Sequence, residues 1–158
     1  MNPRKRDLSL IVLVALLLSG CSAAVQSGQS AESSGGAVEL AVSETCSEGS
    51  DPQCVSVDGQ YIVGPSAFES ATVEDAAVAE SDGQNAVDVT FTDDGTAVFN
   101  SLTEEAAQAG KDARLVVKIG DEIRAAVTVK ESLIGDSVTI VLSPDDSAQT
   151  VVDLINND

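Results

Sequence analysis

The chain has 158 residues, enough for one modest domain, and its 26 acidic against eight basic side chains give a formal net charge of -18. Such a polyanion repels phosphate backbones and anionic head groups, so we expect no nucleic-acid partner and no basic membrane-binding patch. The absence of histidine removes the usual general base near neutral pH and the commonest metal ligand. We therefore expect no enzymatic activity, no cofactor and no metal site.

The first twenty residues have the pattern of a bacterial lipoprotein signal peptide. A cationic segment, Arg4 to Arg6, precedes an apolar run from Leu8 to Leu18. As a helix this run spans about 16 Å, about half the hydrocarbon thickness of a bilayer, which is typical of a signal peptide and too short for a membrane anchor. The run ends in Leu-Ser-Gly-Cys, which matches the motif read by lipoprotein signal peptidase.

Cys21 is therefore predicted to carry the lipid that holds the protein to the extracytoplasmic side of a cell membrane, with palmitate-like acyl chains as the anchor. The alternative is an ordinary signal peptide followed by an unmodified cysteine. The next residues are mostly Ser, Gly, Gln and Ala, which predicts an acylated flexible tether over 21–36. The expected organisation is a signal peptide at 1–20, this tether, and a domain at 37–158.

The remaining cysteines, Cys46 and Cys54, flank a segment that contains Gly, Ser, Asp and Pro and favours a turn. In an oxidising extracytoplasmic compartment a disulfide is the default expectation. The alternatives are a redox pair, which usually has CxxC spacing, and a metal site, which would want histidine or more thiols.

Hydrophobic periodicity predicts the elements of the domain in chain order. Residues 37–43 and 60–65 are predicted strands, the second ended by Gly-Pro, and residues 70–79 are a predicted short helix with Val73, Ala76 and Ala77 on one face. Residues 86–92 form the clearest strand, because Val87, Val89 and Phe91 alternate with polar positions.

Thr92 is a predicted N-cap for a helix that runs to about residue 108 and ends at Gly110, with Val98, Phe99, Leu102 and Ala106 as its buried stripe. A hairpin over 114–129 and a strand over 137–142 follow. Ser143 is a predicted N-cap of a last helix that buries Ala148, Val151, Val152 and Ile155. The order β-α-β-β-β-α predicts an α+β fold, an antiparallel-rich sheet with two main helices on one face and the other face solvated or partly covered by residues 37–80.

Four segments, 61–65, 87–103, 109–123 and 143–155, together resemble the head subdomain of the first large extracytoplasmic domain of the SecD/SecDF preprotein-translocase subunit. The shared features are a Tyr-x-x-Gly-Pro strand, a Gly-x-x-x-Phe-x-x-x-Thr helix and a Gly-Asp turn that the family has in the order Asp-Gly. The residues are Tyr61, Gly64 and Pro65, then Gly95, Phe99 and Thr103, then Gly120 and Asp121. The proline that follows the hairpin in the family is absent from Ala-Ala-Val at 125–127.

The resemblance implies a SecD-head-like domain and contact with emerging preprotein. It implies no motor, since the proton-conducting membrane part of the family has no counterpart in these segments. Tyr61 and Phe68 could line a binding patch, but with so few aromatic residues we expect the core to take them.

Pairs of adjacent acids at 93–94, 104–105, 121–122 and 145–146 are the main candidates for chemistry. A glycosidase-like carboxylate pair is one interpretation. The other is structural: helix N-termini, a turn and a solvated helix face all favour negative charge there.

Two functions of different classes follow. The first is a protein- or peptide-interaction module that binds exported or envelope proteins near the export site, for example by strand addition at the strand over 137–142. The second is a structural or ligand-binding envelope lipoprotein unrelated to translocation. A hydrolytic enzyme ranks behind both.

Overall fold

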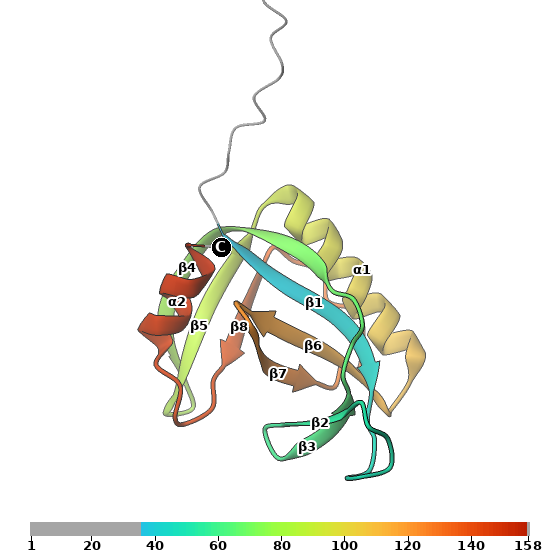
Figure 1. The fold of residues 1–158 in the computed structure, drawn as a ribbon. Coiled ribbons are helices and arrows are strands. Elements are labelled where there is room, and N and C mark those ends of the chain that lie inside the picture. The colour runs from blue at the N-terminus through green and yellow to red at the C-terminus, as the bar shows by residue number, and fades with distance from the viewer. Residues whose placement is uncertain (1–35, 158) are drawn as a thin grey trace, which may run out of the picture.

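The structure is a computed structural model and describes residues 36–157. The predicted signal peptide, Cys21 and all but the last residue of the predicted tether lie outside the described residues. A six-stranded antiparallel sheet curls around one core, with two helices packed against it and a separate two-stranded hairpin below (Figure 1). The elements in chain order are β1 (Ala37–Glu44), β2 (Cys54–Val57), β3 (Gln60–Val63), β4 (Glu69–Ser81), β5 (Gln84–Phe91), α1 (Asp93–Ala109), β6 (Ala113–Ile119), β7 (Glu122–Val127), β8 (Ser137–Val141) and α2 (Ala148–Ile155).

The strand order in the sheet is β7-β6-β1-β4-β5-β8, so the first and fourth strands of the chain lie at its centre. The α+β class and the β-α-β-β-β-α succession are confirmed by the last six elements. Residues 37–80 do more than cover a face, because β1 and β4 join the two halves of the sheet through their pairings with β6 and β5.

The helix predicted over residues 70–79 is wrong, since these residues belong to β4. Asp82 and Gly83 both have positive φ, 52° and 78°, and make the tight turn that folds β4 back onto β5. With this partner available, alternation places Ala71 and Val73 in the core, both fully buried. The pairing of a long hairpin therefore overrides the weak helical spacing of small residues.

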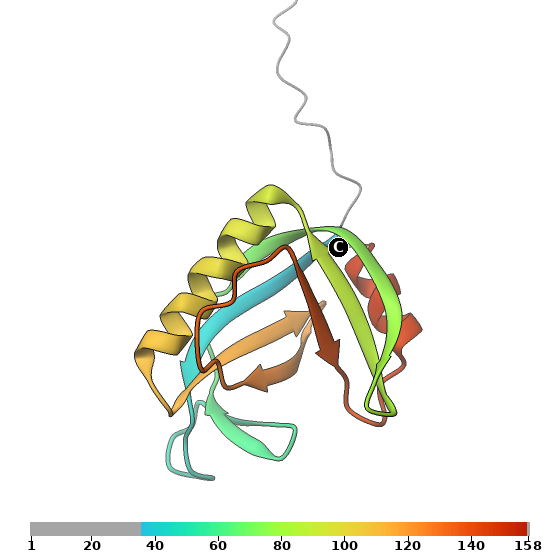
Figure 2. The same ribbon diagram turned by 180° about the vertical axis from the view of Figure 1, so that it is seen from behind.

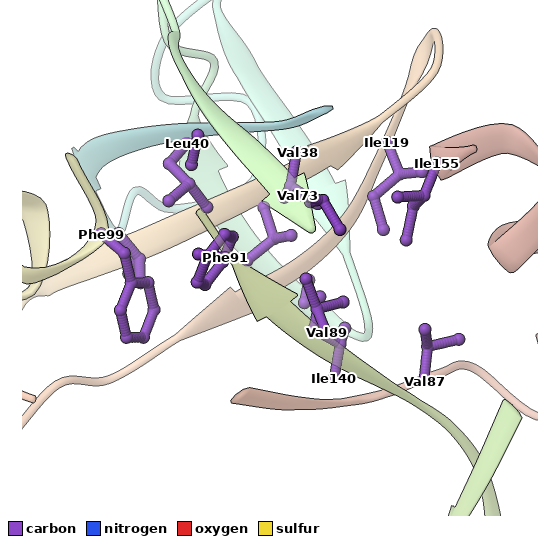
Figure 3. Packing of buried hydrophobic residues seen from close by; sticks show 14 of the residues in the cluster. Val38, Leu40, Val73, Val87, Val89, Phe91, Phe99, Ile119, Ile140 and Ile155 are labelled. Carbon is purple, nitrogen blue, oxygen red and sulfur yellow. The ribbon is translucent and has the colours of Figure 1, made fainter. Parts of the chain in front are cut away.

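One hydrophobic cluster receives side chains from all six strands of the large sheet and from both helices, and Figure 3 shows several of them converging. Phe91 at the end of β5 stacks on Phe99 of α1, with ring centroids 5.1 Å apart. Val89 and Ile140 come from neighbouring strands, and Ile155 of α2 closes the far end of the cluster beside Ile119. Both helices thus contribute to the same cluster as the strands, as the sequence pattern predicts.

Helix α1 begins and ends where the sequence indicates. The Thr92 side chain accepts a hydrogen bond from the backbone N–H of Gly95 at 3.2 Å, and Gly110 follows the last turn with φ 101°. The acids Asp93 and Asp94 occupy the first turn, where the helix dipole favours negative charge.

Helix α2 begins later than predicted, with Ser147 and not Ser143 as its N-cap. The hydroxyl of Ser143 donates instead to Asp58 of the β2–β3 turn, and the Asp146 carboxylate accepts from Arg124 of β7 at 2.6 Å. These two contacts hold residues 143–146 as a turn, because their polar groups are already used outside the helix. The predicted apolar face, Ala148, Val151, Val152 and Ile155, is buried.

The β2–β3 hairpin covers part of the opposite face of the sheet. Its Val57 and Ile62 pack against Val116 of β6 and Ala126 of β7, and Phe68 joins them from the chain that leads into β4. The outer face is therefore partly covered by residues within 37–80, one of the two arrangements expected from the sequence.

Candidate functional site

An apolar groove lies inside the curl of the sheet, between its two edge strands β7 and β8. Its volume is about 410 Å³, within the range of small-ligand sites. Residues of the hydrophobic core form its floor: Val38 and Leu40 of β1, Phe91 of β5, and Phe99 of α1. The walls come from the two edge strands and from residues 128–136, the segment between β7 and β8 that we call the strap. Figure 2 shows the strap running beside α1 before it enters β8.

Exposed apolar side chains gather at this groove. Val127 and Leu133, which line the groove, are 45% and 44% exposed, and Val141 of the bordering strand β8 is 40% exposed, with its side chain on the outer face of the sheet. Ile134, next to Leu133 in the strap, is 91% exposed. Apolar surface held in contact with water at a concave site is typical of a binding surface.

Strand β8 presents an open hydrogen-bonding edge. The N–H of Phe91 donates to the Asp136 carbonyl at 2.6 Å, and the N–H of Leu142 donates to the Asn85 carbonyl at 2.9 Å. Since direction alternates along an antiparallel ladder, the even-numbered residues 136–142 face β5. The backbone groups of Ser137, Thr139 and Val141 therefore point away from β5, and the described part of the chain supplies no strand to pair with them.

Strand β7 is a less open edge than β8. The carbonyl of Ala126 accepts a hydrogen bond from the side-chain amide of Gln60 at 2.5 Å, so the β2–β3 hairpin occupies part of it. Arg124 joins β7 to Asp146, which follows β8 in the chain. These contacts tie the edge strands together at one end of the groove and leave β8 as the more open of the two edges.

The strap is fixed to α1 by two side chains. The Thr103 hydroxyl is fully buried; it donates to the Asn100 carbonyl at 2.9 Å and accepts from the Leu133 N–H at 3.2 Å. The Asn100 amide, with its nitrogen toward the strap, donates to the carbonyls of Leu133 at 2.9 Å and Gly135 at 3.2 Å. These bonds hold Leu133 in the wall of the groove.

The predicted helix motif Gly95, Phe99 and Thr103 is brought together by the fold as the face of α1 that builds the groove. Gly95 lies so close to β4 that an added Cβ would be 2.1 Å from the Thr72 carbonyl oxygen. Phe99 forms part of the groove floor, and Thr103 holds the strap by accepting a hydrogen bond from it. The motif therefore has an architectural role.

The other motif residues lie away from the groove. Tyr61 is in β3, Gly64 donates its N–H to the Gln53 carbonyl at 2.8 Å, and Pro65 follows in the connection to β4. Gly120, with φ 60°, makes the β6–β7 turn with Asp121.

A disulfide joins Cys46 to Cys54, with their Cα atoms 6.2 Å apart, and it closes the loop before β2. Beside it, a hydrogen bond with Glu48 raises the pKa of the Tyr61 hydroxyl above its ordinary value, and partial desolvation adds to this. Neither Tyr61 nor Phe68 is fully buried, and Lys118 lies over the Phe68 ring at 5.3 Å. Neither aromatic residue lines the groove.

The acid pairs are dispersed over the molecule. Asp93 and Asp94 begin α1, and Glu104 and Glu105 are exposed on the same helix. The pair at 121–122 spans the β6–β7 turn and the start of β7, and the pair at 145–146 lies in the turn before α2. Within residues 36–157 no group of three or more acidic or cysteine side chains is placed to hold a metal ion. No described helix is long and apolar enough to cross a bilayer.

The groove residues of the strap were not predicted from the sequence. Leu133 and Ile134 stand as an apolar pair in a segment assigned to no element, and that unexplained pair was the available signal. No sequence signal pointed to Asn100, because a polar residue on a helix gives no indication of a hydrogen-bond partner 33 or more residues away.

The fold and the groove together define an α+β domain with a curled, incompletely closed sheet and an apolar site between its edges. Among solved structures it is similar to SecDF, described as a membrane component that enhances protein export. The TM-score is 0.51 at 14% identity, and the match covers 78% of this chain and 62% of that chain. The SecD-like fold is thereby confirmed. The sequence matches no family model, and no curated protein matches it.

Proposed function

We propose that this chain is a membrane-anchored extracytoplasmic lipoprotein without catalytic activity, whose domain binds polypeptide segments in connection with protein export. Cys21 carries the lipid, and the domain at 37–158 binds its partners through the groove between β7 and β8. The partners are exported or envelope proteins.

The observation that carries the proposal is the combination of an apolar groove with an open strand edge along it. Pairing to β8 would satisfy the backbone of an extended segment, and the groove would take its apolar side chains. The likeness to part of SecDF adds support from fold alone.

A site-specific photo-crosslinker tests the binding. Placed at Val141 beside the groove, it should capture a secreted reporter polypeptide whose folding is blocked, identified by an antibody to that reporter. Val78 of β4 is the matched control, because it is an exposed strand valine outside the groove. Equal capture at both positions, or none at either, would refute groove binding.

The anchor is tested separately by mass spectrometry of the mature N-terminus. We expect cleavage before Cys21 and a mass increment of two or three acyl chains on that residue. An unmodified Cys21 in a membrane-free fraction would remove the lipoprotein part of the proposal and leave groove binding standing.

The enclosed apolar floor favours one second candidate, an envelope lipoprotein that binds a small apolar ligand. In this second candidate, the backbone edge of β8 takes no part in ligand binding. Binding of a fluorescent fatty acid that an unfolded polypeptide fails to displace would favour this alternative.

A further inference from the structure

We propose that the segment bound at the groove is an extended peptide in which apolar residues alternate with basic ones, and that it pairs antiparallel to β8 as a seventh strand. This inference rests on the proposed function and specifies its substrate class. Three features of β8 carry it: the direction of its free backbone groups, the character of its two faces, and the charge around them.

The backbone sets the pairing. Ser137, Thr139 and Val141 direct N–H and C=O away from β5, so they form the narrow hydrogen-bonded pairs with an added antiparallel strand. All three side chains are exposed on the outer face of the sheet. Peptide residues paired with them also project outward, and the residues between project into the groove.

The inward positions require apolar side chains. They would lie alongside Val138 and Ile140 of β8 and above Leu40, Phe91 and Phe99, in a space whose lining is mostly aliphatic and aromatic. Lys130 and Glu131, both from the strap, are the charged residues of that lining. A charged side chain directed inward would lose its hydration without a partner.

The outward positions favour basic side chains. On the outer face the Asp88 carboxylate accepts a hydrogen bond from the Thr139 hydroxyl at 2.5 Å, so it lies beside the edge where the peptide binds. Asp136 immediately precedes β8 and Asp145 follows it, and both are exposed. Across residues 36–157, 23 acidic side chains stand against five basic ones, which attracts a cationic segment from a distance.

The same charge argues against a second copy as the occupant. Two such domains joined edge to edge would bring two large negative charges together, and the repulsion between them opposes pairing.

The test uses the purified domain with its disulfide intact and three labelled heptapeptides with blocked ends, in which valine alternates with lysine, serine or glutamate. We expect the lysine peptide to bind most tightly, by about two- to fivefold per lysine relative to serine, and the glutamate peptide most weakly. The lysine advantage should shrink in 0.5 M salt because screening weakens surface charge pairs.

Two N-methylated forms of the lysine peptide test the pairing. In the antiparallel arrangement the lysine N–H groups face β8 and the valine N–H groups face away from it. Methylation at the lysines should abolish binding, and methylation at the valines should preserve it. Any other pattern overturns the antiparallel pairing.

Two protein variants localise the effects. Thr139→Pro removes an outward N–H that the β5 ladder does not use, and it should reduce binding at least tenfold, whereas Thr139→Ala, which keeps that N–H, should not. Asp88→Asn should reduce the extra affinity of the lysine peptide and leave the affinity of the serine peptide unchanged. Asp51→Asn, in the distant disulfide loop, is its control.

The outcomes separate the two proposals. Equal affinity for all three charge patterns would overturn this inference and leave peptide binding intact. Failure of every peptide to bind, together with tight binding of a fluorescent fatty acid in the groove, would overturn both.

Discussion

The backbone N–H of Leu133 donates a hydrogen bond to the buried hydroxyl of Thr103 at 3.2 Å, and this contact joins the wall of the groove to helix α1. Thirty residues separate the two partners in the chain. The wall of the groove is therefore held in part by a buried hydroxyl that belongs to the Gly95, Phe99 and Thr103 face of the helix.

Thr103→Val should destabilise the domain by about 1–2 kcal/mol, because it leaves the Leu133 N–H without a partner while preserving volume. Urea unfolding followed by circular dichroism measures this, and proteolytic cleavage within 128–136 should become faster. Thr96→Val is the matched control on the same helix, since the buried Thr96 hydroxyl has no hydrogen-bond partner. A loss of stability at Thr96 as large as at Thr103 would contradict the role of the strap contact.

Gly95→Ala should destabilise by about 2 kcal/mol or more, because the added methyl would meet the backbone of Thr72 at 2.1 Å and force α1 away from β4. The same urea experiment measures it. Gly135→Ala serves as the control: a Cβ there meets nothing within 4 Å. If Gly95→Ala proved as stable as the parent protein, the close approach of helix and strand would be wrong.

Replacing both Cys46 and Cys54 with serine should lower the free energy of unfolding by about 2–3 kcal/mol, because the short loop they close gains freedom mainly in the unfolded chain. Reduction of the parent protein should give a similar loss. Peptide affinity at the groove should not change, since neither cysteine lines it. Alkylation of the unreduced protein at either position would show that the disulfide is absent.

The ionisation of Tyr61 can be followed alone, because the chain has one tyrosine and no tryptophan. Absorbance at 295 nm should show a pKa above the ordinary value of 10.0, owing to the Glu48 carboxylate. Glu48→Gln should lower this pKa, and Glu80→Gln at the distant β4–β5 turn should not.

The raised pKa also fixes the sign of the pH dependence. The folded protein holds the Tyr61 proton more tightly than the unfolded chain, so this contribution to stability is complete below about pH 10. It is lost as the pH rises through the folded-state pKa. A midpoint at or below 10.0 in the parent protein would contradict the contact with Glu48.

Local sequence was sufficient for the elements whose signals are contained within them. Thr92 caps α1, Gly110 ends it, and the alternation of Val87, Val89 and Phe91 places β5. These features depend on neighbours a few residues apart, where intrinsic preference and hydrophobic period agree. The class of fold follows from their order.

The tertiary structure alone decided the rest. Residues 70–79 became strand because β5 offered a partner, and α2 began at Ala148 because Asp58 and Arg124 took the polar groups of Ser143 and Asp146. The groove exists because the curl of the sheet sets β7 opposite β8, strands that are consecutive in the chain and at opposite ends of the strand order. Long-range pairing of this kind leaves no periodic signal in the sequence, since each residue involved satisfies a partner that the local pattern does not contain.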